Sequence, residues 1–333
     1  MKALCLDNIG VLRIEERPLP SRSSGEALLR VTHCAICRTD AKMWKQGQRD
    51  LVLPRVLGHE ICGYLIETGK RFVVWPGLAC GVCSQCKEGR ENLCKEMRIL
   101  GFHHDGGFCD WVAAPRSSLI PVPDNLPGYL ACLTEPMACA INALDQSNIV
   151  AGQKVLIYGG GTLGLMIAIG AQARGARPFI VEKQELKLKK SEALRKAFGI
   201  PGDLGCTSTG FDVAINAAPD LDTLSDALGR LVAGACFCLF SGITGDDCVP
   251  VHYLNEIHYR QLHLTGAYGC TRYHMECALN AINEFKHDME QLIDDKISLE
   301  EVAGRLPQVL SGELFKIVVV PDTANDGENP EKK

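Results

Sequence analysis

The stretch "KVLIYGGGTLGLMIAIGAQARG", residues 154–175, decides the fold of this 333-residue chain. It predicts an apolar strand over residues 154–158, then a glycine turn, then an apolar helix that ends near Gly175. A strand that enters a helix through such a turn is the first half of a βαβ unit, which builds a parallel sheet. The sequence therefore predicts an α/β domain.

The glycines of this turn match the dinucleotide-binding pattern GxGxxG in the strand–turn–helix context that the pattern requires. Gly159 permits the tight turn, Gly161 lets a pyrophosphate approach the backbone at the helix N-terminus, and Gly164 allows the helix to pack closely on the strand. The predicted cofactor-binding residues of the turn are Gly159, Gly161, Thr162, Leu163 and Gly164.

A carboxylate at the end of the next predicted strand, "RPFIVE", supports a nucleotide site. Glu182 follows Gly161 by about 20 residues, where a carboxylate accepts hydrogen bonds from the adenosine ribose and repels a 2′-phosphate. NAD is therefore favoured over NADP, and Lys183 and Lys187 weaken this preference; Lys187 is also a predicted cofactor-binding residue. The alternative for Glu182 is a solvated charge at a strand end.

Further strands extend the predicted parallel sheet on both sides of a helical pattern at residues 221–232. The strands are "DVAIN", "CFCLF" and "LHLTGA". The predicted fold class is α/β, with a Rossmann cofactor domain over residues 137–268. Residues 1–136 and 269–333 are predicted to form a second, discontinuous, mainly β domain, which carries the catalytic groups.

The composition excludes several classes of function. A formal charge of −5 argues against general affinity for nucleic acid or anionic membranes, and the expected ligands are small molecules. The start of the chain has no secretory pattern, and no uncharged apolar run reaches about 18 residues, so a cytoplasmic protein is expected. The 17 cysteines are odd in number and mostly scattered among apolar residues, which does not suggest a disulfide framework.

Four cysteines nevertheless lie close together in "LACGVCSQCKEGRENLC", residues 78–94, with the spacing C-x2-C-x2-C-x7-C. They are the predicted metal ligands Cys80, Cys83, Cys86 and Cys94. Gly81 and Gly89 let the loop fold around one tetrahedral zinc ion at about 2.3 Å from each sulfur. An iron–sulfur cluster is the alternative, but its usual run closes with C-x3-C-P. A zinc ion with four sulfur ligands has no open position, so this site is predicted to stabilise rather than catalyse.

A second set of metal ligands is dispersed over three segments, "HCAICRTDAK", "LGHE" and "LTEPMACA". They contribute Cys37, His59, Glu60 and Glu135. The alternative for Cys37 is a redox pair with Cys34, which leaves "GHE" and the second glutamate unexplained.

The "GHE" tripeptide, the four-cysteine loop and the glycine turn, in this order, resemble the zinc-dependent medium-chain dehydrogenase/reductase family. The resemblance is strongest to the sorbitol, threonine and butanediol dehydrogenase branch and runs from Met1 to about Phe315. It implies a GroES-like catalytic domain, zinc at a catalytic and a structural site, and a homodimer or homotetramer. The implied reaction is the NAD-dependent interconversion of a secondary alcohol (polyol, sugar derivative or hydroxy amino acid) and its ketone.

The resemblance also assigns the catalytic metal site. It implies that Cys37 and His59 hold the zinc, and that Glu60 or Glu135 supplies the remaining carboxylate ligand or alternates with a water molecule. Both glutamates are therefore predicted catalytic residues as well as ligands. Family members differ on which of the two binds directly, so the choice stays open.

Three further residues after Cys37 receive roles from the same resemblance. Thr39 is predicted to take the proton of the substrate. Lys42 stands where many relatives have a histidine that passes the proton to water; either a lysine of lowered pKa or water alone completes this step. Arg38 replaces the usual glycine and resembles a pyrophosphate-binding arginine of other alcohol dehydrogenases, with a solvent-facing arginine as the alternative.

Two segments are shorter than in relatives, about "GKRF" after residue 68 and "IPGDLGCTSTG" after residue 199, where a strand and a helix are expected to be lost. The residues predicted to line the substrate pocket are Trp44, His103, His104 and Tyr268, with the two histidines equally readable as surface loop. The alternative functions are a zinc-free enoyl or quinone reductase on the same fold and a nonenzymatic protein that binds zinc and NAD.

Overall fold

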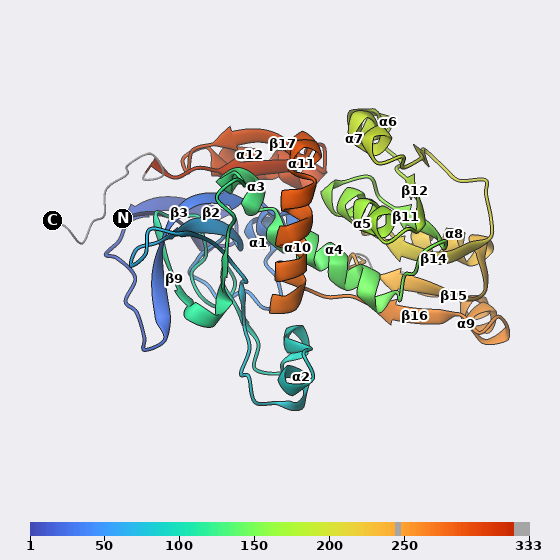
Figure 1. Cartoon of the computed structure of the whole chain (residues 1–333), viewed down its shortest axis with the longest axis horizontal. Coiled ribbons are helices and arrows are strands. Elements are labelled where there is room, and N and C mark those ends of the chain that lie inside the picture. Colours follow the sequence, from blue (N-terminus) through green and yellow to red (C-terminus); the bar gives the residue numbers. More distant parts are fainter. Residues whose placement is uncertain (244–247, 323–333) are drawn as a thin grey trace. The chain divides into compact units, whose positions relative to one another are not determined.

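The computed structural model describes residues 1–243 and 248–322. The chain forms two compact units (Figure 1). Unit 1 contains Met1–Ala138 and Cys270–Lys333, and unit 2 contains Cys139–Gly269. Among the described residues, no helix has both the length and the apolar character needed to cross a membrane.

Unit 2 is built on a six-stranded sheet in the order β13-β12-β11-β14-β15-β16, and every neighbouring pair is parallel. The strands are β11 (Lys154–Tyr158), β12 (Arg177–Val181), β13 (Gly202–Asp203), β14 (Phe211–Asn216), β15 (Leu231–Leu239) and β16 (His263–Gly266). The strand order reverses between β11 and β14, which is the switch point where Rossmann folds bind dinucleotides. The predicted Rossmann sheet is confirmed.

The helices of unit 2 follow the expected strand–helix alternation. They are α5 (Thr162–Ala173), α6 (Glu185–Lys190), α7 (Glu192–Ala197), α8 (Asp222–Arg230) and α9 (Val251–Tyr259), while α4 (Thr134–Gln146) runs from unit 1 into unit 2. Nearly every residue from Gly164 to Ala171 of α5 is buried, which explains why this helix is apolar all round. Helix α8 corresponds to the helical pattern predicted at residues 221–232.

The segment after Gly199 corrects one expectation. A strand is kept there, although it is only the two residues of β13, and residues 204–210 form no helix. The strand persists because the backbone N–H groups of Ile180 and Glu182 in the β12 segment donate to the carbonyls of Pro201 and Asp203 at 3.0 Å. The shortening therefore removes the helix but leaves the edge of the sheet paired.

Unit 1 is mainly β structure, as predicted. Its seven-stranded sheet has the order β10-β6-β5-β3-β18-β17 with β9 also paired to β3, and a three-stranded sheet has the order β2-β1-β4. The strands are β1 (Lys2–Asn8), β2 (Val11–Glu16), β3 (Glu26–Ala35), β4 (Arg55–Val56), β5 (Glu60–Leu65), β6 (Arg71–Val74), β9 (Trp111–Pro115), β10 (Leu119–Pro121), β17 (Ile293–Ile297) and β18 (Lys316–Val319). One apolar core, which includes Leu29, Ile61 and Ile317, joins both sheets.

The other shortened segment of the chain is a simple hairpin in this sheet. Strands β5 and β6 pair antiparallel, and the turn between them contains Gly69 with a φ of 65°. Glycine adopts this left-handed conformation without steric cost. The sheet therefore continues from β5 to β6 despite the shorter connection.

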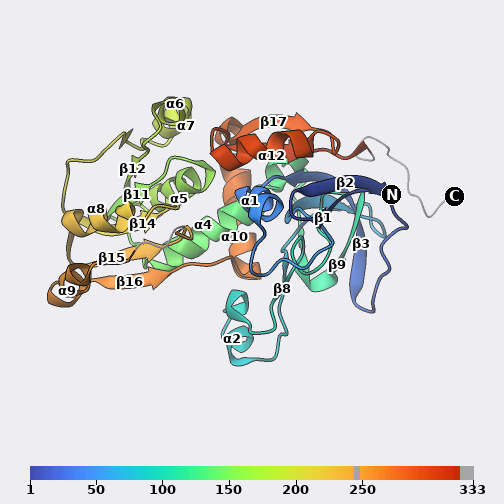
Figure 2. The same ribbon diagram turned by 180° about the vertical axis from the view of Figure 1, so that it is seen from behind.

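The helices of unit 1 are few and short except for α10. They are α1 (Arg38–Gln46), α2 (Ser84–Lys87), α3 (Gly128–Ala131), α10 (Arg272–Glu284), α11 (Lys286–Met289) and α12 (Val302–Ser311), together with three 3₁₀ turns at Glu91–Leu93, Arg116–Ser118 and Glu290–Leu292. The cysteine loop, which carries α2, is closed at its base by the antiparallel strands β7 (Gly77–Leu78) and β8 (Arg98–Ile99). Figures 1 and 2 both show α2 standing away from the sheets of unit 1.

Candidate active site

Three of the predicted dispersed ligands converge in unit 1. One ligand atom each of Cys37, His59 and Glu60 lies within 4.8 Å of the others. Cys37 is the N-cap residue of α1, directly after the end of β3. Glu60 is the first residue of β5 and pairs with Ala35 of β3. The antiparallel register of β3 and β5 therefore brings two distant segments of the sequence to one point.

Cys37 occupies a favourable place for a metal ligand. Its backbone N–H donates to Oδ2 of Asp40 at 2.8 Å, which fixes the first turn of α1 around it. The N-terminus of a helix carries a partial positive charge and favours an anionic group such as a thiolate. The side chain is half-buried, so it is reachable from the site but shielded from bulk water.

Asp40 is a functional residue that the sequence reasoning missed. Its side chain is fully buried, and its Oδ1 accepts a hydrogen bond from the N–H of Gly58 at 3.2 Å and lies 3.4 Å from Nδ1 of His59. Burial alone would lower the pKa of His59, but the negative charge of Asp40 outweighs it and the pKa is raised well above its ordinary value. A carboxylate behind a ligating histidine orients the ring and strengthens it as a ligand.

The glycine of "GHE" is required by the packing around it. Gly58 has a φ of 92°, and a Cβ there would lie 2.7 Å from the ring of Phe108 and 2.9 Å from Sγ of Cys34. Cys34 is itself buried in the core, which raises the pKa of its thiol well above the ordinary value. A fully buried thiol is inaccessible to thiol–disulfide exchange with other molecules, which argues against a redox pair of Cys34 with Cys37.

Glu60 makes an ion pair that the sequence did not indicate. Its Oε1 accepts a hydrogen bond from Nζ of Lys316, the first residue of β18, and both side chains are buried. Burial raises the pKa of Glu60 to about 7, although the charge of Lys316 opposes this change. Burial would lower the pKa of Lys316, but the negative charge of Glu60 raises it above its ordinary value.

The donor group fits a zinc ion. Oε2 of Glu60 is buried and makes no hydrogen bond with any described residue, whereas Nδ1 of His59 faces Asp40 and leaves Nε2 for a ligand. Buried polar atoms without partners are rare in folded proteins, and each needs a physical explanation. A thiolate, an imidazole and a carboxylate form the donor set of a catalytic zinc site with one position left open.

Two other predicted catalytic residues, Glu135 and Thr39, lie near this donor group. Glu135 lies in the first turn of α4 and acts electrostatically on Glu60, but it is not among the donors within 4.8 Å of Cys37 and His59. Thr39 is the second residue of α1 and is half-buried. The structure thus places both on elements that start beside the donor group.

Arg38 and Lys42 lie on the same helix, α1, as Thr39. Lys42 is half-buried, and burial, together with the charge of Arg38, lowers its pKa below the ordinary value. A lowered pKa is the direction of change that a proton-accepting lysine requires. Arg38 is exposed on unit 1.

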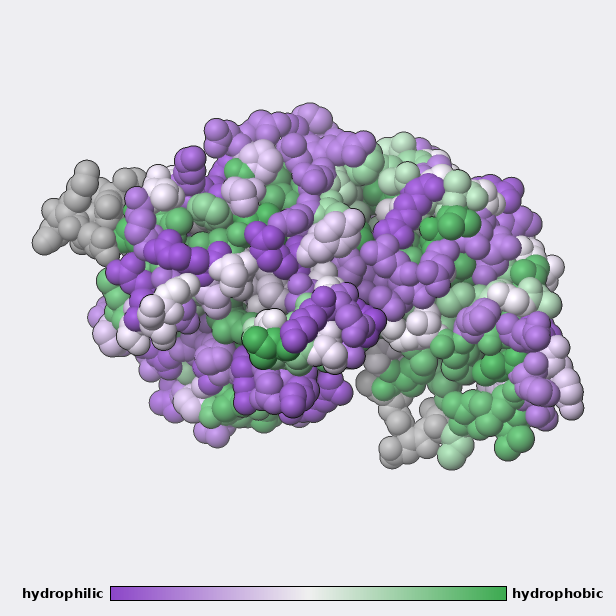
Figure 3. Space-filling view, turned by 60° about the horizontal axis from the view of Figure 1, so that its bottom comes forward, coloured by the Kyte–Doolittle hydropathy of each residue, from purple (hydrophilic) through white to green (hydrophobic). Residues whose placement is uncertain are grey.

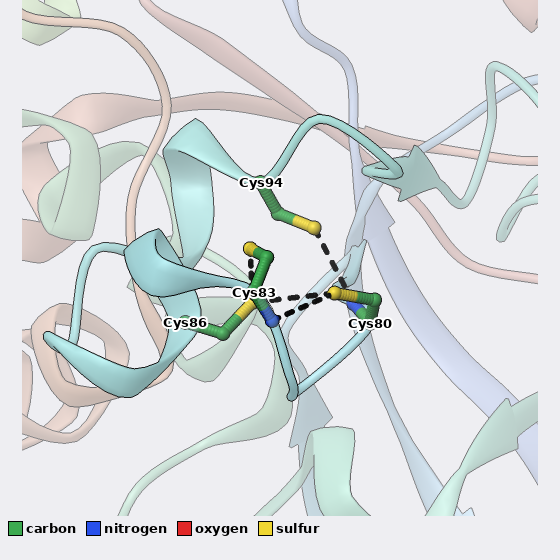
Figure 4. A group of neighbouring side chains, drawn as sticks. All are labelled: Cys80, Cys83, Cys86 and Cys94. Atoms are coloured by element: carbon green, nitrogen blue, oxygen red, sulfur yellow. Dashed lines mark hydrogen bonds between the residues drawn. The ribbon is translucent and has the colours of Figure 1, made fainter.

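The four clustered cysteines converge as predicted (Figure 4). Sγ of Cys86 lies 3.9 Å from Sγ of Cys80 and 3.5 Å from Sγ of Cys83. Four sulfurs at about 2.3 Å from one zinc ion have mutual separations of about 3.8 Å in a regular tetrahedron. In the described part of the chain, which holds all 17 cysteines, none forms a disulfide. The sulfurs are therefore spaced for zinc and not for disulfide bonds.

The backbone of this loop also prepares its sulfurs for a metal. Gly81 and Gly89 both have a φ of 71°, the left-handed conformation that closes the loop. Backbone N–H groups of Val82 and Cys83 lower the pKa of Cys80 to about 6, whereas burial raises the pKa of Cys86 to about 12. A cation at the centre is what allows all the sulfurs to be thiolates together.

The three glycines of the nucleotide turn have three different environments in unit 2. Gly159 has a φ of 108°, and a Cβ on Gly164 would lie 1.8 Å from the carbonyl oxygen of Gly159. A Cβ on Gly161, the N-cap of α5, would meet no described atom within 4 Å. The turn therefore combines a left-handed backbone conformation that favours glycine, a close contact between helix and turn, and an open backbone at a helix N-terminus. These are the features that a pyrophosphate site requires.

Glu182 lies beside this turn but is not a solvated charge, so that alternative is wrong. The side chain is buried, and its two carboxylate oxygens accept hydrogen bonds from the N–H of Gly160 at 2.8 Å and of Gln184 at 2.9 Å. Nζ of Lys187 lies 3.4 Å from the same carboxylate. The predicted ribose-binding group is therefore held in a fixed orientation before any ligand arrives.

Of the four predicted pocket residues, three belong to unit 1 and one belongs to unit 2. His103 uses Nδ1 to accept a hydrogen bond from the N–H of Ile99 at 3.1 Å and so stabilises its own turn, while His104 is exposed. Trp44 packs on the apolar core of unit 1, and Tyr268 belongs to unit 2. For His103 a structural role is shown, and the lining of the substrate pocket stays a prediction.

Comparison with known proteins extends these observations. Residues 23–124 match the family described as the alcohol dehydrogenase GroES-like domain. The chain is 34% identical to a zinc-type alcohol dehydrogenase-like protein of Haemophilus influenzae, over 58% of this chain and 60% of that protein. It is 27% identical to an L-threonine 3-dehydrogenase of a Chelativorans species, over 92% of this chain and 95% of that enzyme. It is 28% identical to a D-altritol 5-dehydrogenase of Agrobacterium fabrum, over 87% of this chain and 90% of that enzyme.

A solved structure agrees with these relatives. It is that of a protein from Sinorhizobium meliloti, described as a zinc-binding dehydrogenase and bound to NADP; it is 27% identical, covers 96% of this chain and 99% of its own, and has a TM-score of 0.83. Both units thus fall within one class, the zinc- and NAD(P)-dependent oxidoreductases that act on CH–OH groups. Over most of its length the chain is similar to an L-threonine 3-dehydrogenase and a D-altritol 5-dehydrogenase, and residues 23–124 match the alcohol dehydrogenase GroES-like domain. Zinc and NAD are its cofactors.

Proposed function

We propose that this chain oxidises a secondary alcohol of a polyol, a sugar derivative or a hydroxy amino acid to the ketone, with NAD as the hydride acceptor. The observation that carries the proposal is the convergence of Cys37, His59 and Glu60 within 4.8 Å, with a buried oxygen of Glu60 that has no hydrogen-bond partner among the described residues. Zinc bound by these donors supplies a Lewis acid.

The names of two relatives support a secondary alcohol. One acts at carbon 3 of L-threonine and the other at carbon 5 of D-altritol. Both positions lie inside a carbon chain, where a hydroxyl is a secondary alcohol. The same two names, of a hydroxy amino acid and a polyol, support a polar substrate.

The residues of α1 provide a route for the proton that the alcohol loses. We assign Thr39 to accept it from the substrate hydroxyl and Lys42 to carry it toward water, because Thr39 follows Cys37 by two residues and the half-buried Lys42 has a lowered pKa. The glycine turn and Glu182 are assigned to hold NAD, because a buried carboxylate favours a free ribose over a 2′-phosphate. Arg38 is assigned to the pyrophosphate.

The proposal is tested by an NAD reduction assay over polyols, amino-acid alcohols and sugar phosphates, followed at the absorbance of NADH. We expect turnover with at least one class, about two zinc ions per chain, and a preference for NAD over NADP. Cys37→Ser is expected to abolish turnover in a protein that still folds. A wild-type chain with only one zinc ion would contradict the mechanism.

Metal content also separates the alternative functions. A zinc-free reductase has no use for a thiolate, an imidazole and a carboxylate at one buried point, and a purely structural protein has no use for an open donor set. The first alternative predicts no zinc, and the second predicts one tightly held ion in the cysteine loop. The free thiols suit a reducing compartment, so we also propose a cytoplasmic location.

We further propose that the chain forms a homodimer or homotetramer. Figure 3 shows a hydrophobic surface over β15, β16 and α9 of unit 2, at the lower right beside the grey atoms. Its exposed apolar residues are Val232, Val249, Val251, Leu254, Tyr259 and Leu264. None of the residues of α9 is buried, and β16 pairs only with β15 among the described strands. A second copy related by a two-fold axis can pair with this edge antiparallel to it.

A further inference from the structure

Lys316 is a buried lysine for which none of the roles assigned above accounts. Its Nζ donates to Oε1 of Glu60 and to the backbone carbonyl of Ile36, the latter at 3.4 Å. Ile36 directly precedes Cys37, and its N–H donates to the carbonyl of Ile317 at 2.9 Å. Strand β18 therefore contacts the segments of two proposed zinc ligands.

The ion pair leaves Glu60 with one available oxygen. Oε1 is taken by Lys316, while Oε2 is buried and has no hydrogen-bond partner in the described part of the chain. A carboxylate held in this way can offer a metal ion a single oxygen from a fixed direction. It cannot rotate to present both oxygens unless the contact with Lys316 breaks.

Lys316 also offsets part of the negative charge of the site. It interacts electrostatically with Cys37, Glu60 and Glu135, which together carry three negative charges when all are ionised. The buried carboxylate of Asp40 adds a fourth beside His59, so a zinc ion and Lys316 together offset most of this charge. Without the lysine, a further carboxylate would be buried beside the metal with an uncompensated charge, which is costly.

We propose that Lys316 is a positioning residue for the catalytic zinc: it holds Oε1 of Glu60 and so directs Oε2 to the metal. This rests on the proposed function, because it requires zinc at Cys37 and His59. Through Glu60, Lys316 controls zinc affinity and coordination geometry. It is not expected to affect the four-cysteine site.

The test compares Lys316→Met with the wild type in zinc affinity, measured by chelator competition, and in the absorption spectrum after cobalt(II) replaces the catalytic zinc. We expect Lys316→Met to bind this zinc about 10- to 100-fold more weakly, as for other residues that orient metal ligands. The cobalt bands are expected to shift because Glu60 changes its binding mode. Lys316→Arg is expected to restore both readouts in part.

Two more variants keep the test decisive. The double variant Glu60→Gln with Lys316→Met removes both charges of the buried pair and is expected to fold even if Lys316→Met alone does not. Its cobalt spectrum should match that of Glu60→Gln alone, because the lysine acts only through the glutamate. Lys196→Met removes the lysine of the Lys196–Glu192 pair on α7 of unit 2 and is expected to leave zinc binding unchanged.

The outcomes separate this inference from the proposed function. If the wild-type chain takes up only the ion of the cysteine loop, the proposed function fails. If it takes up two ions and Lys316→Met has the wild-type zinc affinity and cobalt spectrum, only the role of Lys316 is overturned. A loss of thermal stability without either change would assign Lys316 to folding alone.

Discussion

Asp40 and Lys316 are buried charged residues, and each contacts one proposed zinc ligand from behind. Asp40 accepts hydrogen bonds from the N–H groups of Cys37 and Gly58 and lies beside His59, and Lys316 holds Glu60. The geometry of the zinc site therefore depends on residues that do not bind the metal. Such supporting groups commonly affect metal affinity almost as much as the ligands do.

At this scale the first prediction concerns Asp40→Asn. The amide replaces one acceptor oxygen with a donor, which would face either the N–H of Cys37 or the N–H of Gly58. We expect zinc binding at the Cys37 site to weaken about 10- to 100-fold, measured by chelator competition, with a matching loss of kcat at limiting zinc. Asp50→Asn, on the loop after α1, is the control and should have no effect. Unchanged zinc affinity in Asp40→Asn would remove Asp40 from the site.

The sequence predicts the ligands of this site but only part of their support. Cys37, His59 and Glu60 were found through short segments whose residue types suit zinc. Asp40 was detectable, because an aspartate three residues after Cys37 takes the position that caps a helix start. Lys316 was not detectable, because 256 residues separate it from Glu60 and only the register of β18 beside β3 brings them together.

At the scale of elements, the turn between β11 and α5 contains one glycine that matters for packing and another that is proposed to matter for cofactor binding. A Cβ on Gly164 would overlap the carbonyl of Gly159, whereas a Cβ on Gly161 would meet no described atom within 4 Å. The two glycines of this motif are therefore needed for different physical reasons. One is required by packing, and the other keeps the backbone open.

The second prediction uses this difference. Gly164→Ala should lower the free energy of unfolding by about 1–3 kcal/mol, because the helix must move away from the turn. Gly161→Ala should leave the unfolding midpoint nearly unchanged but raise the Kd for NADH, because the methyl group occupies the approach of the pyrophosphate. Calorimetry and fluorescence titration measure the two effects. Equal NADH affinity in wild type and Gly161→Ala would refute the proposed cofactor contact.

The third prediction concerns the cysteine loop. Cys86→Ser removes one of the four sulfurs and should reduce the zinc content by one ion per chain, with a fall of about 5–15 °C in Tm. The variant should keep the wild-type kcat when kcat is expressed per zinc ion bound at the Cys37 site. Cys236→Ser, in β15, is the control because it is half-buried and away from the loop. Loss of kcat with unchanged zinc content would instead give the loop a role in catalysis.

Element prediction from the sequence succeeded where the pattern was local. Strands β11, β12, β14, β15 and β16 lie where apolar runs were predicted. The run is nearly continuous in β11 and β14 because these parallel strands are largely buried, whereas β16 is an edge strand with no buried residue. Strand β13 was missed because two residues carry no periodicity. It exists only through its pairing with β12, which is a tertiary interaction.

At the scale of the whole molecule, the apolar surface of unit 2 remains to be covered. Helix α9 has no fully buried residue; Tyr253 and Ile257 pack against the core of unit 2, while Val251, Leu254 and Tyr259 are exposed. An exposed apolar surface next to a sheet edge is typical of a subunit interface, and uncovered it would promote aggregation. The proposed self-association provides the cover.

The fourth prediction tests this interface with Leu254→Lys combined with Leu264→Lys. Charges on α9 and β16 should shift the molar mass in light scattering toward the 36.2 kDa monomer or, if the assembly is a tetramer, toward a smaller species. Leu186→Lys, which is 84% exposed on α6, should leave the mass unchanged. A wild-type monomer would contradict the assembly proposal, and an unchanged mass in the double variant would place the interface elsewhere.

The place of β18 in the chain has a consequence for biosynthesis. Strand β18 begins at Lys316 yet pairs with β3, whose last residue is Ala35. Because a ribosome makes the chain from its N-terminus, the segments that carry Cys37 and Glu60 wait until residues 316–319 are made before their sheet and their ion pair with Lys316 are complete. Metal loading of the proposed catalytic site is thereby expected only after β18 has been made, whereas the cysteine loop needs only residues 77–99 and can take up its ion much earlier.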